Sequence, residues 1–507
     1  MQNLPPAQSP YRLPTLKVPT FDPGLCETIF ELEMVKELFC GLAGWSEDQT
    51  VIPLAAKHWE ALDGGRRYVF HLRQDLLWSD GEPVTAGDFE FAWKRVLDPA
   101  TRSSTANLLY DILGAKDFNQ GRVADAGAVG VTASDPHTLV VELEVPCSYF
   151  PYILGDPSAF AVPNHVVERY GKAWTEPGRI VTSGAFQLES WDQPPGKTIH
   201  FTRNPRYFGK YRGNIERVTL AFYQNELDMY QAFVAGELDS AEFLLPQLQQ
   251  KEWKHFQEVG QLHISSLPFV DAIYFMTDCP PFDNPDLRRA LALATDRERL
   301  AREVENKLPA TGGYIPPSLP GHSAHAGLPY DPEQAQRILA AAGYPQGRGF
   351  PPVRLLIEIV GLEKGDNLVF AFLQDMWKEN LGVTIQKCRQ DPAARQFEVG
   401  QEFHFFFIGW FADYPDPASF LQTNYLVDQS HWQNPVFDAL IEEGRRTFDQ
   451  VQRVDLYRRA DRILTEEAVV LPLFYGHIYE LRQPWVHKPP GSSIHSLQWK
   501  DITLMPH

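Results

Sequence analysis

The segment 353–360, with the sequence VRLLIEIV, restricts the possible folds of this chain more than any other segment. It is apolar on both faces for much of its length, and a strand of that kind has to be covered on both sides. Helices usually supply this cover in a layered domain. Strand and helix signals alternate irregularly over the rest of the chain. We therefore predict an α/β fold of mixed α and β elements.

Start signals indicate three helices. Thr85 and Asp88 have the spacing of a capping box, in which each side chain satisfies a backbone N–H of the other residue. Proline in its favoured first helical position marks two more starts, at Pro285 and Pro332. The helix from Pro332 is expected to end at Gly343, because glycine suits a left-handed cap. Further strands are predicted at Arg67–Leu72, Leu139–Leu143, Thr198–Thr202, Arg217–Tyr223 and His404–Gly409.

The size and charge of the chain limit its class. A chain of 507 residues corresponds to about two to four domains. The net charge is −19, so the chain is a poor candidate for contact with phosphate backbones, and we predict no nucleic-acid partner. The five cysteines lie far apart without a CxxC pair. That pattern argues against a zinc ribbon and leaves the disulfide state open.

The usual catalytic and cofactor motifs are absent from the sequence. It contains no HExxH, GxSxG or GxGxxG pattern, and Trp191 stands where a phosphate loop ending in Gly196-Lys197 needs glycine. The 15 histidines show no metal-ligand spacing, and His404 reads as a structural residue in an apolar strand. A hydrolase would need a nucleophile, a metal site or an acid–base pair, and none is visible. We therefore predict no enzyme, no catalytic residue, no cofactor and no metal site.

No export or membrane signal is visible in the sequence. The first residues contain four prolines and no apolar core of a signal peptide. No apolar run approaches the ~18 residues that span a bilayer. Three explanations remain open: an omitted export signal, which we favour, a mature lipoprotein segment, or a cytoplasmic or fused sensor domain.

One stretch, 405–417 (FFFIGWFADYPDP), resembles a binding site. A hydrophobic strand runs into Gly409 and Trp410, and Asp413 follows at its end. A carboxylate there could fix a cation while the strand edge binds an extended chain. Alternatively, Asp413 caps a turn and Asp416 starts a helix, and local sequence alone favours this second interpretation.

Several blocks, taken in order, resemble the oligopeptide-binding proteins of ABC importers, the peptide/nickel class of extracytoplasmic solute-binding proteins known as family 5. The resemblance extends from about residue 17 to the C-terminus, and the joint order and spacing of the blocks make it specific. The matching blocks are Arg67–Arg73, Trp78–Phe89, Ile180–Phe186, Arg203–Phe208, Pro281–Ala290, Asp296–Arg297, Gly409–Tyr414 and Val470–Tyr475.

The resemblance implies a two-lobed, periplasmic-binding-protein-like clamp with an additional inserted domain. The ligand would lie between the lobes and be enclosed when they close about a hinge. The block from Trp78 is then structural, with a turn at Asp80-Gly81 followed by the helix cap at Thr85. The implied divisions are lobe I at 1–40, 164–268 and 480–507, the inserted domain at 41–163, and lobe II at 269–479.

The resemblance also implies a way of binding peptides. An extended peptide would lie between two strand segments, one from each lobe, which should be Glu27–Ile29 and Gly409–Phe411. Main-chain hydrogen bonds would read the peptide backbone. Asp413 matches the aspartate that pairs with the α-ammonium group of the ligand, and Tyr110 matches a pocket tyrosine. The predicted ligand-binding residues are Glu27, Thr28, Ile29, Tyr110, Gly409, Trp410, Phe411, Asp413 and Tyr475.

The chain departs from the family where tri- to pentapeptide binders hold the ligand carboxylate. Phe407 and Glu398 stand at positions where those proteins have basic residues, and Asp391 stands where the resemblance places a tryptophan, some twenty residues before Gly409. Arg389 and Arg395 lie nearby in sequence. The amine end of a peptide site is retained and the carboxylate end is altered, which leaves a longer, C-terminally modified or non-peptide ligand open.

The resemblance thus implies a solute-binding protein that captures oligopeptides and delivers them to the permease subunits of an ABC transporter. The protein would be monomeric, extracytoplasmic and peripheral to the membrane, as a periplasmic protein or a surface lipoprotein. The alternatives are the ligand-sensing domain of a regulatory protein with the same fold and a binder of a non-peptide solute.

Overall fold

The structure is a computed structural model that divides into two compact units. The first unit contains Met1–Ser265 and Tyr479–His507, and the second contains Ser266–Ile478. The division falls inside two long strands, β12 (Leu262–Phe275) and β17 (Val470–Arg482). The structure describes residues 7, 9–16, 20–192, 198–243, 250–304, 308–357, 363–388, 403–422, 426, 430–489 and 498–506.

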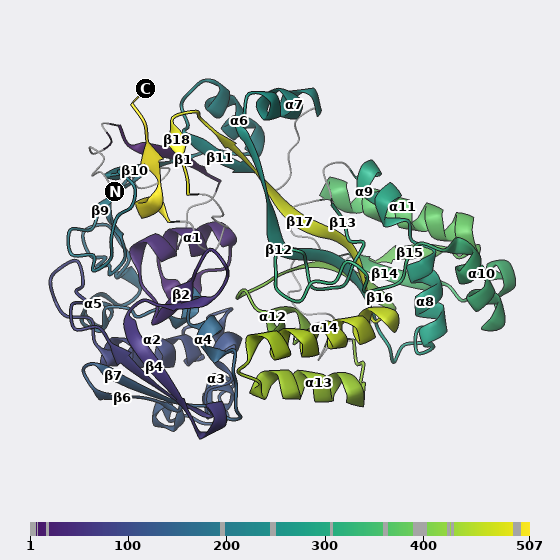
Figure 1. Cartoon of the computed structure of the whole chain (residues 1–507), viewed down its shortest axis with the longest axis horizontal. Helices are drawn as coiled ribbons and strands as arrows, with labels where there is room; N and C mark the ends of the chain where they lie inside the picture. The colour runs from purple at the N-terminus through teal and green to yellow at the C-terminus, as the bar shows by residue number, and fades with distance from the viewer. Residues whose placement is uncertain are drawn as a thin grey trace. The chain divides into compact units, whose positions relative to one another are not determined.

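Both ends of the described chain belong to the first unit, as the N and C marks in Figure 1 show. Its first sheet has the strand order β1-β10-β9-β8, with β1 parallel to β10 and the other pairs antiparallel. A short pair, β18 (Val486–His487) with β19 (Thr503–Leu504), lies near the C-terminus. The sheet strands are β1 (Tyr11–Thr15), β8 (Phe186–Trp191), β9 (Thr198–Arg203) and β10 (Arg217–Phe222).

A second, fully antiparallel sheet of the first unit has the order β4-β5-β7-β6. Its strands are β4 (Ala56–Leu62), β5 (Arg67–Leu72), β6 (Val131–Asp135) and β7 (Thr138–Glu142). The strands predicted at Arg67–Leu72, Leu139–Leu143, Thr198–Thr202 and Arg217–Tyr223 are confirmed to within one residue at each end. The predicted domain boundaries near residues 40 and 163 fall inside the first unit and stay predictions.

The block from Trp78 is built as the sequence predicts. Trp78 is fully buried, and its backbone closes a turn through Gly81, whose φ of 101° suits glycine. The Asp88 carboxylate accepts the Thr85 N–H at 2.8 Å and completes the capping box of helix α2 (Ala86–Leu97). This block therefore has a structural role in the first unit.

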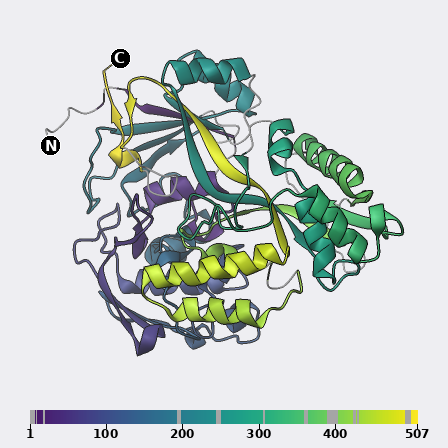
Figure 2. The ribbon, with the colours of Figure 1, turned by 45° about the vertical axis from the view of Figure 1, so that its right-hand side comes forward.

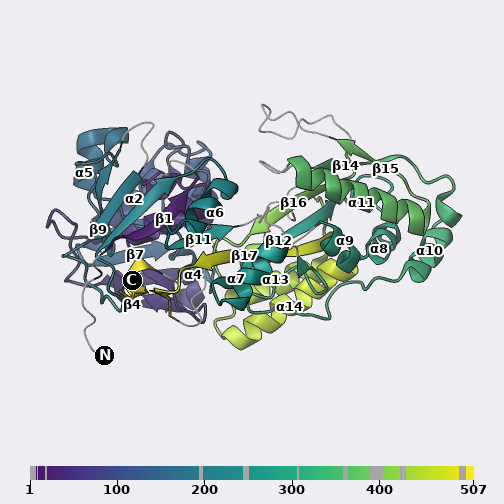
Figure 3. The same ribbon diagram turned by 90° about the horizontal axis from the view of Figure 1, so that it is seen from above.

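The main sheet has the order β11-β17-β12-β16-β14-β15. β14 (Val353–Ile357) lies between β16 (Phe405–Phe411) and β15 (Ile385–Cys388) and is parallel to both. The internal position predicted for this apolar strand is therefore confirmed. Figures 1 and 2 show β12 and β17 running side by side, and Figure 3 shows the helices that flank β14 and β15. The remaining strands are β11 (Ser240–Phe243) and β13 (Leu308–Pro309), which pairs with β17.

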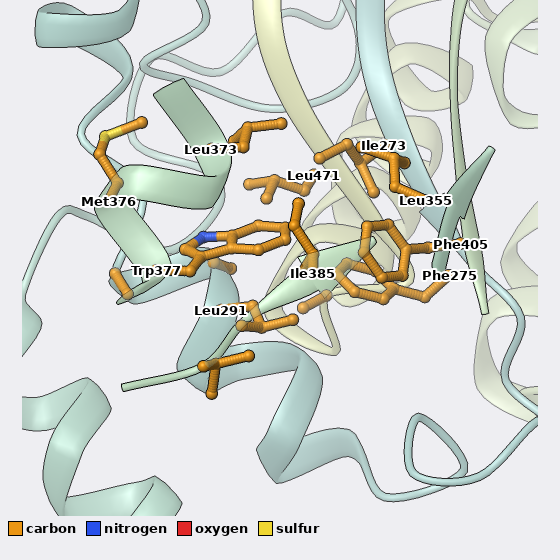
Figure 4. Packing of buried hydrophobic residues seen from close by; sticks show 14 of the residues in the cluster. Ile273, Phe275, Leu291, Leu355, Leu373, Met376, Trp377, Ile385, Phe405 and Leu471 are labelled. Carbon is orange, nitrogen blue, oxygen red and sulfur yellow. The ribbon is translucent and has the colours of Figure 1, made fainter. Parts of the chain in front are cut away.

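Helices α8 (Pro285–Leu293), α10 (Pro332–Ala341) and α11 (Glu363–Leu381) contribute to the core of the second unit. Trp377 lies inside this core near Phe405, and its indole N–H donates to Thr295 Oγ1 at 2.9 Å (Figure 4). Both proline starts are confirmed, and Gly343 has the predicted left-handed conformation just after α10. The apolar side chains of β14 and β16 thus face a closed core.

The other elements connect these layers. Near the end of β16 lie α12 (Ala418–Leu421), α13 (Pro435–Arg446) and α14 (Gln450–Glu466), with the last two packed against each other. The rest are α1 (Ile29–Leu38), β2 (Ala43–Trp45), β3 (Val51–Pro53), α3 (Ala115–Asn119), α4 (Phe150–Ile153), α5 (Asn164–Tyr170), α6 (Glu226–Val234), α7 (Gln250–Glu258) and α9 (Arg297–Glu303).

Two sequence questions have structural answers. All five cysteines are free thiols, and burial raises the pKa of Cys40 to about 12. Within the described ranges, no helix has the length and apolar character needed to cross a membrane.

We expect Trp78→Ala to destabilise the protein by about 3–5 kcal/mol, because it removes a fully buried aromatic side chain. Thermal and urea unfolding would measure the loss. Trp59→Ala, at a half-buried position of β4 in the same unit, is the matched control and should cost less. Normal stability of Trp78→Ala together with lost ligand binding would contradict the structural role.

Candidate functional site

The candidate site begins with the register of β16 against β12. In this antiparallel pair, Gly409 lies opposite Asp271 and Phe411 lies opposite Phe269. On its other side, β16 pairs with β14 over Phe405–Phe407. The first half of β16 is thus held by strands on both sides, and β12 continues to pair with it as far as Phe411.

Gly409 is required by the close approach of an aromatic ring. A Cβ atom at Gly409 would lie 2.3 Å from Phe269 Cζ, and a Cβ atom at Gly476 of β17 would lie 2.7 Å from Phe269 Cβ. The Phe269 side chain therefore fits against the backbones of both strands that flank β12. Any larger residue at 409 would displace this ring or shift the strand.

Three hydrogen bonds hold the chain that leaves β16. The Ala412 N–H donates to the Pro268 carbonyl at 2.8 Å. The Trp410 indole N–H donates to the Ser419 carbonyl at 2.9 Å, and the Asp413 backbone N–H donates to Ser419 Oγ at 3.0 Å. Trp410 and Asp413 stay partly exposed. The turn thus presents an indole and a carboxylate at the surface of the second unit.

A buried ion pair holds the next part of the same turn. Asp416 lies 2.7 Å from Arg453 of α14, and both side chains are almost completely buried. Burial raises the pKa of Asp416, and the Arg453 guanidinium opposes that rise. Asp416 also accepts the Ala418 N–H at the start of α12, as the helix-start interpretation predicted. Asp416 is therefore a structural residue, whereas Asp413 lies in a more exposed position.

The segment Glu27–Ile29 is not a strand, and this expectation was wrong. Thr28 caps α1, which begins at Ile29, and Glu31 completes a capping box. The Glu31 carboxylate accepts the Glu27 and Thr28 N–H groups at 3.1 and 3.0 Å. Thr28 keeps an extended backbone, with φ −122° and ψ 152°, and Glu27 is exposed. A ligand would therefore meet the N-terminal end of a helix here, and contact with Glu27–Ile29 stays a prediction.

Tyr110 lies in the first unit, just after a short 3-10 turn. Its hydroxyl donates to Asn119 Oδ1 at 2.6 Å, and its ring is partly exposed. Partial burial raises the pKa of Tyr110, so the hydroxyl is neutral at physiological pH. The predicted pocket role requires only the exposed part of the ring and stays a prediction.

Tyr475 lies on β17 and is buried in the second unit. Its hydroxyl donates to the Gly313 carbonyl at 2.6 Å. The backbone here also adjoins Asp461, which accepts the Tyr314 N–H at 2.8 Å, and burial raises the pKa of Asp461 to about 7. The hydroxyl of Tyr475 therefore joins β17 to the chain before Tyr314. Direct contact of Tyr475 with a ligand stays a prediction.

Of the residues predicted at the altered carboxylate end of the site, the structure describes Phe407. Phe407 belongs to the apolar core of the second unit and is 2% exposed. It therefore offers neither charge nor surface to a ligand. Glu398, Asp391, Arg389 and Arg395 lie outside the described residues.

The residues that support the candidate site were not predicted from the sequence. Phe269 precedes Gly409 by 140 positions, and Arg453 follows Asp416 by 37. No local motif connects either pair, so only the fold identifies them. Ser419 is the second residue of α12, and a serine at this position gave no distinct sequence signal.

We expect Arg453→Met to destabilise the second unit by about 3–5 kcal/mol, because it leaves the buried Asp416 carboxylate without its cation. Arg453→Met combined with Asp416→Asn should recover part of the loss. The matched control is Arg458→Met on the same helix, whose exposed pair with Asp455 should contribute less than ~1 kcal/mol. Equal losses for the two single variants in urea unfolding would contradict the assigned role of Arg453.

Comparisons with known proteins all point to bacterial binding proteins that act outside the cytoplasm. The family model for bacterial extracellular solute-binding proteins, family 5, matches residues 50–432. The periplasmic oligopeptide-binding protein OppA of Escherichia coli is 32% identical over 495 residues, which cover 93% of this chain and 87% of the relative. The probable deoxycholate-binding periplasmic protein YgiS of the same organism is also 32% identical, over 94% of this chain and 89% of the relative.

Solved structures share the fold over almost the whole chain. The Escherichia coli murein tripeptide binding protein MppA superposes with a TM-score of 0.78 at 25% identity, over 99% of this chain and 100% of the other. The Haemophilus influenzae OppA complex with RPPGFSPFR has a TM-score of 0.75 at 25% identity, over 99% and 100% of the two chains. The likeness therefore includes both units.

Proposed function

This chain belongs to family 5 of the bacterial extracellular solute-binding proteins, and from this membership we propose that it captures oligopeptides and delivers them to an ABC permease. It has the mixed α/β, two-lobed clamp fold of the family. Relatives named for oligopeptide or tripeptide binding support the peptide as ligand. In this proposal the protein acts outside the cytoplasm as a monomer, peripheral to the membrane, and performs no chemistry.

The observation that carries the proposal is the contrast between two aspartates in one turn. Asp416 is buried against Arg453 and holds the turn in place. Asp413 is partly exposed directly after Gly409–Phe411, and its backbone is fixed by Ser419. A carboxylate on a turn that is already ordered loses little entropy when it binds a cation. Asp413 is therefore suited to pair with the α-ammonium group of a peptide.

The neighbouring backbone would read the peptide itself. Every peptide carries the same pattern of N–H and C=O groups, so main-chain pairing with Gly409–Phe411 would bind many sequences. The partly exposed Trp410 would pack against the first peptide residues, and its indole is already oriented by Ser419. Glu27–Ile29 and Tyr110 would contribute from the first unit. Tyr475 would support the site through Gly313.

The part of the site that would hold the ligand's C-terminal carboxylate should differ in this chain from that of tri- to pentapeptide binders. Phe407 is held in the apolar core, so a basic residue is missing at that position. We therefore expect weak selection for a free C-terminal carboxylate at that point. A longer or C-terminally amidated peptide should then bind about as well as a free tripeptide, unlike an N-acetylated one.

A thermal-shift screen followed by calorimetry tests the proposed function. The panel contains di- to octapeptides in free, N-acetylated and C-amidated forms, with deoxycholate as a non-peptide arm because a relative of equal identity is named for it. A ligand at about 100 times its dissociation constant should stabilise the protein by about 2.7 kcal/mol. Stabilisation by free-amine peptides supports the proposal. Stabilisation by deoxycholate alone, or by no peptide in protein shown by mass spectrometry to carry no retained ligand, would overturn it.

For the amine anchor, we expect Asp413→Asn to weaken binding of a free-amine tripeptide at least tenfold, or about 1.4 kcal/mol, with little change in melting temperature. The reason is that the ammonium group loses its counter-charge in a partly desolvated site. Asp278→Asn removes the same charge from an exposed position of the same unit and serves as the control. Equal affinities of the two variants by calorimetry would reject the anchor.

A further inference from the structure

Two histidines and a glutamate lie together on the outer face of the β4–β5 hairpin in the first unit. His58 of β4 pairs directly opposite His71 of β5. Glu60 lies two residues after His58 and therefore on the same face, since side chains alternate along a strand. The other face carries Tyr68 and Phe70, which are fully buried. The three polar side chains thus share the side of the hairpin that faces away from the core.

The three side chains are already close enough to share one ion. Their ligand atoms, one from each residue, all lie within 4.8 Å of one another. His71 Nε2 is 3.2 Å from Glu60 Oε1, and the rings of His58 and His71 stack with centroids 4.6 Å apart and an interplanar angle of 23°. Donors around a tetrahedral zinc ion, at about 2.0–2.2 Å from the metal, are separated by roughly 3.3–3.5 Å. A small rotation of these accessible side chains would bring their ligand atoms from within 4.8 Å of one another to the separation that a zinc ion requires.

The backbone around the cluster favours a fixed arrangement. The register of β4 against β5 shifts between Ala56 and His58, so Lys57 is an extra residue next to the His58–His71 pair. Such a bulge increases the local twist and changes the direction of nearby side chains. Ligands on two hydrogen-bonded strands are also positioned more exactly than ligands on loops.

We propose that His58, Glu60 and His71 form a surface site for a divalent first-row transition ion, with zinc as the reference ion and nickel and copper as chemical equivalents. Two imidazole nitrogens and one carboxylate oxygen suit these borderline ions, whereas magnesium and calcium prefer oxygen ligands throughout. Three protein ligands leave a coordination position for water. The site shares no residue with the proposed peptide site, so the two proposals fail or succeed independently.

A second histidine–carboxylate pair in the same unit provides a built-in control. His165 Nε2 lies 2.8 Å from Asp80 Oδ2, and both side chains are partly exposed. This pair has one imidazole, and among the described residues no third histidine, cysteine or carboxylate joins it in a group with metal-ligand geometry. Loss of His165 should therefore leave specific zinc binding unchanged.

The test uses the full chain without an affinity tag, stripped with a chelator that is then removed. Zinc binding is measured by competition with a chromogenic chelator and by calorimetry. We expect one tight zinc ion per chain, weakened roughly tenfold or more by His58→Ala or His71→Ala and less by Glu60→Gln. His165→Ala should bind zinc like the unaltered protein. Zinc binding that is absent, or that is lost equally in all variants, would overturn the proposal.

Cobalt provides a second readout that does not depend on stability. Cobalt bound by two imidazoles and a carboxylate should give the visible absorption bands of a Co²⁺ ion with a low coordination number. Excess zinc should remove these bands. His71→Ala should abolish the bands while its circular dichroism stays unchanged. Bands that persist in His71→Ala would place the ion elsewhere and contradict the site. Calcium and magnesium should produce no competition, and effective competition by either would contradict the assigned ligand chemistry.

Discussion

The packing of one aromatic ring against two glycine backbones sets the geometry on which the candidate site depends. Phe269 of β12 lies so close to Gly409 and Gly476 that neither position has room for a side chain. This contact keeps β12 tightly between β16 and β17, in the register that places Phe411 opposite Phe269. The end of β16, and with it the start of the turn that carries Asp413, follows from that register. The candidate site thus begins at the end of a strand whose first half packs in the core.

Burial then separates two acidic residues that look alike in the sequence. Asp416 is buried and its carboxylate pairs with the guanidinium of Arg453, so its charge stabilises the protein and does not face a ligand. Asp413, three residues earlier, keeps part of its surface exposed. Family membership supplies the class of solute-binding protein, and this contrast supports the proposal that Asp413, and not Asp416, meets a ligand. Phe407 is buried in the apolar core, which agrees with the expectation of an altered carboxylate end.

Local signals in the sequence predicted local structure well. The capping box at Thr85 and Asp88, the proline-started helices and the two-sided apolar strand 353–360 depend on neighbouring residues and on burial pattern, and the structure confirms them where it describes them. The expectation of a strand at Glu27–Ile29 was wrong because Thr28 and Glu31 have the spacing of a capping box. The capping-box spacing is visible in the sequence, but the strand was predicted from the family resemblance instead.

Long-range pairing limited what the sequence could predict about sites. The 15 histidines show no metal-ligand spacing along the chain, because His58 and His71 meet only through the register of β4 against β5. The bulge at Lys57 shifts that register, and no local pattern indicates it. The roles of Phe269 and Arg453 could not be predicted either, because their partners Gly409 and Asp416 lie far away in sequence. Candidate ligand residues could be named from the family resemblance, whereas the residues that support them were identified only from the fold.

The proposed function depends above all on Asp413 holding the amino end of an extended peptide. A crystal structure of the protein with a bound free-amine tripeptide would test this pairing. We expect the ligand ammonium nitrogen at about 2.7–2.9 Å from an Asp413 carboxylate oxygen, with the first peptide residues hydrogen-bonded along Gly409–Phe411. A bound tripeptide whose ammonium group pairs with a different carboxylate, and whose backbone leaves Gly409–Phe411 untouched, would contradict it.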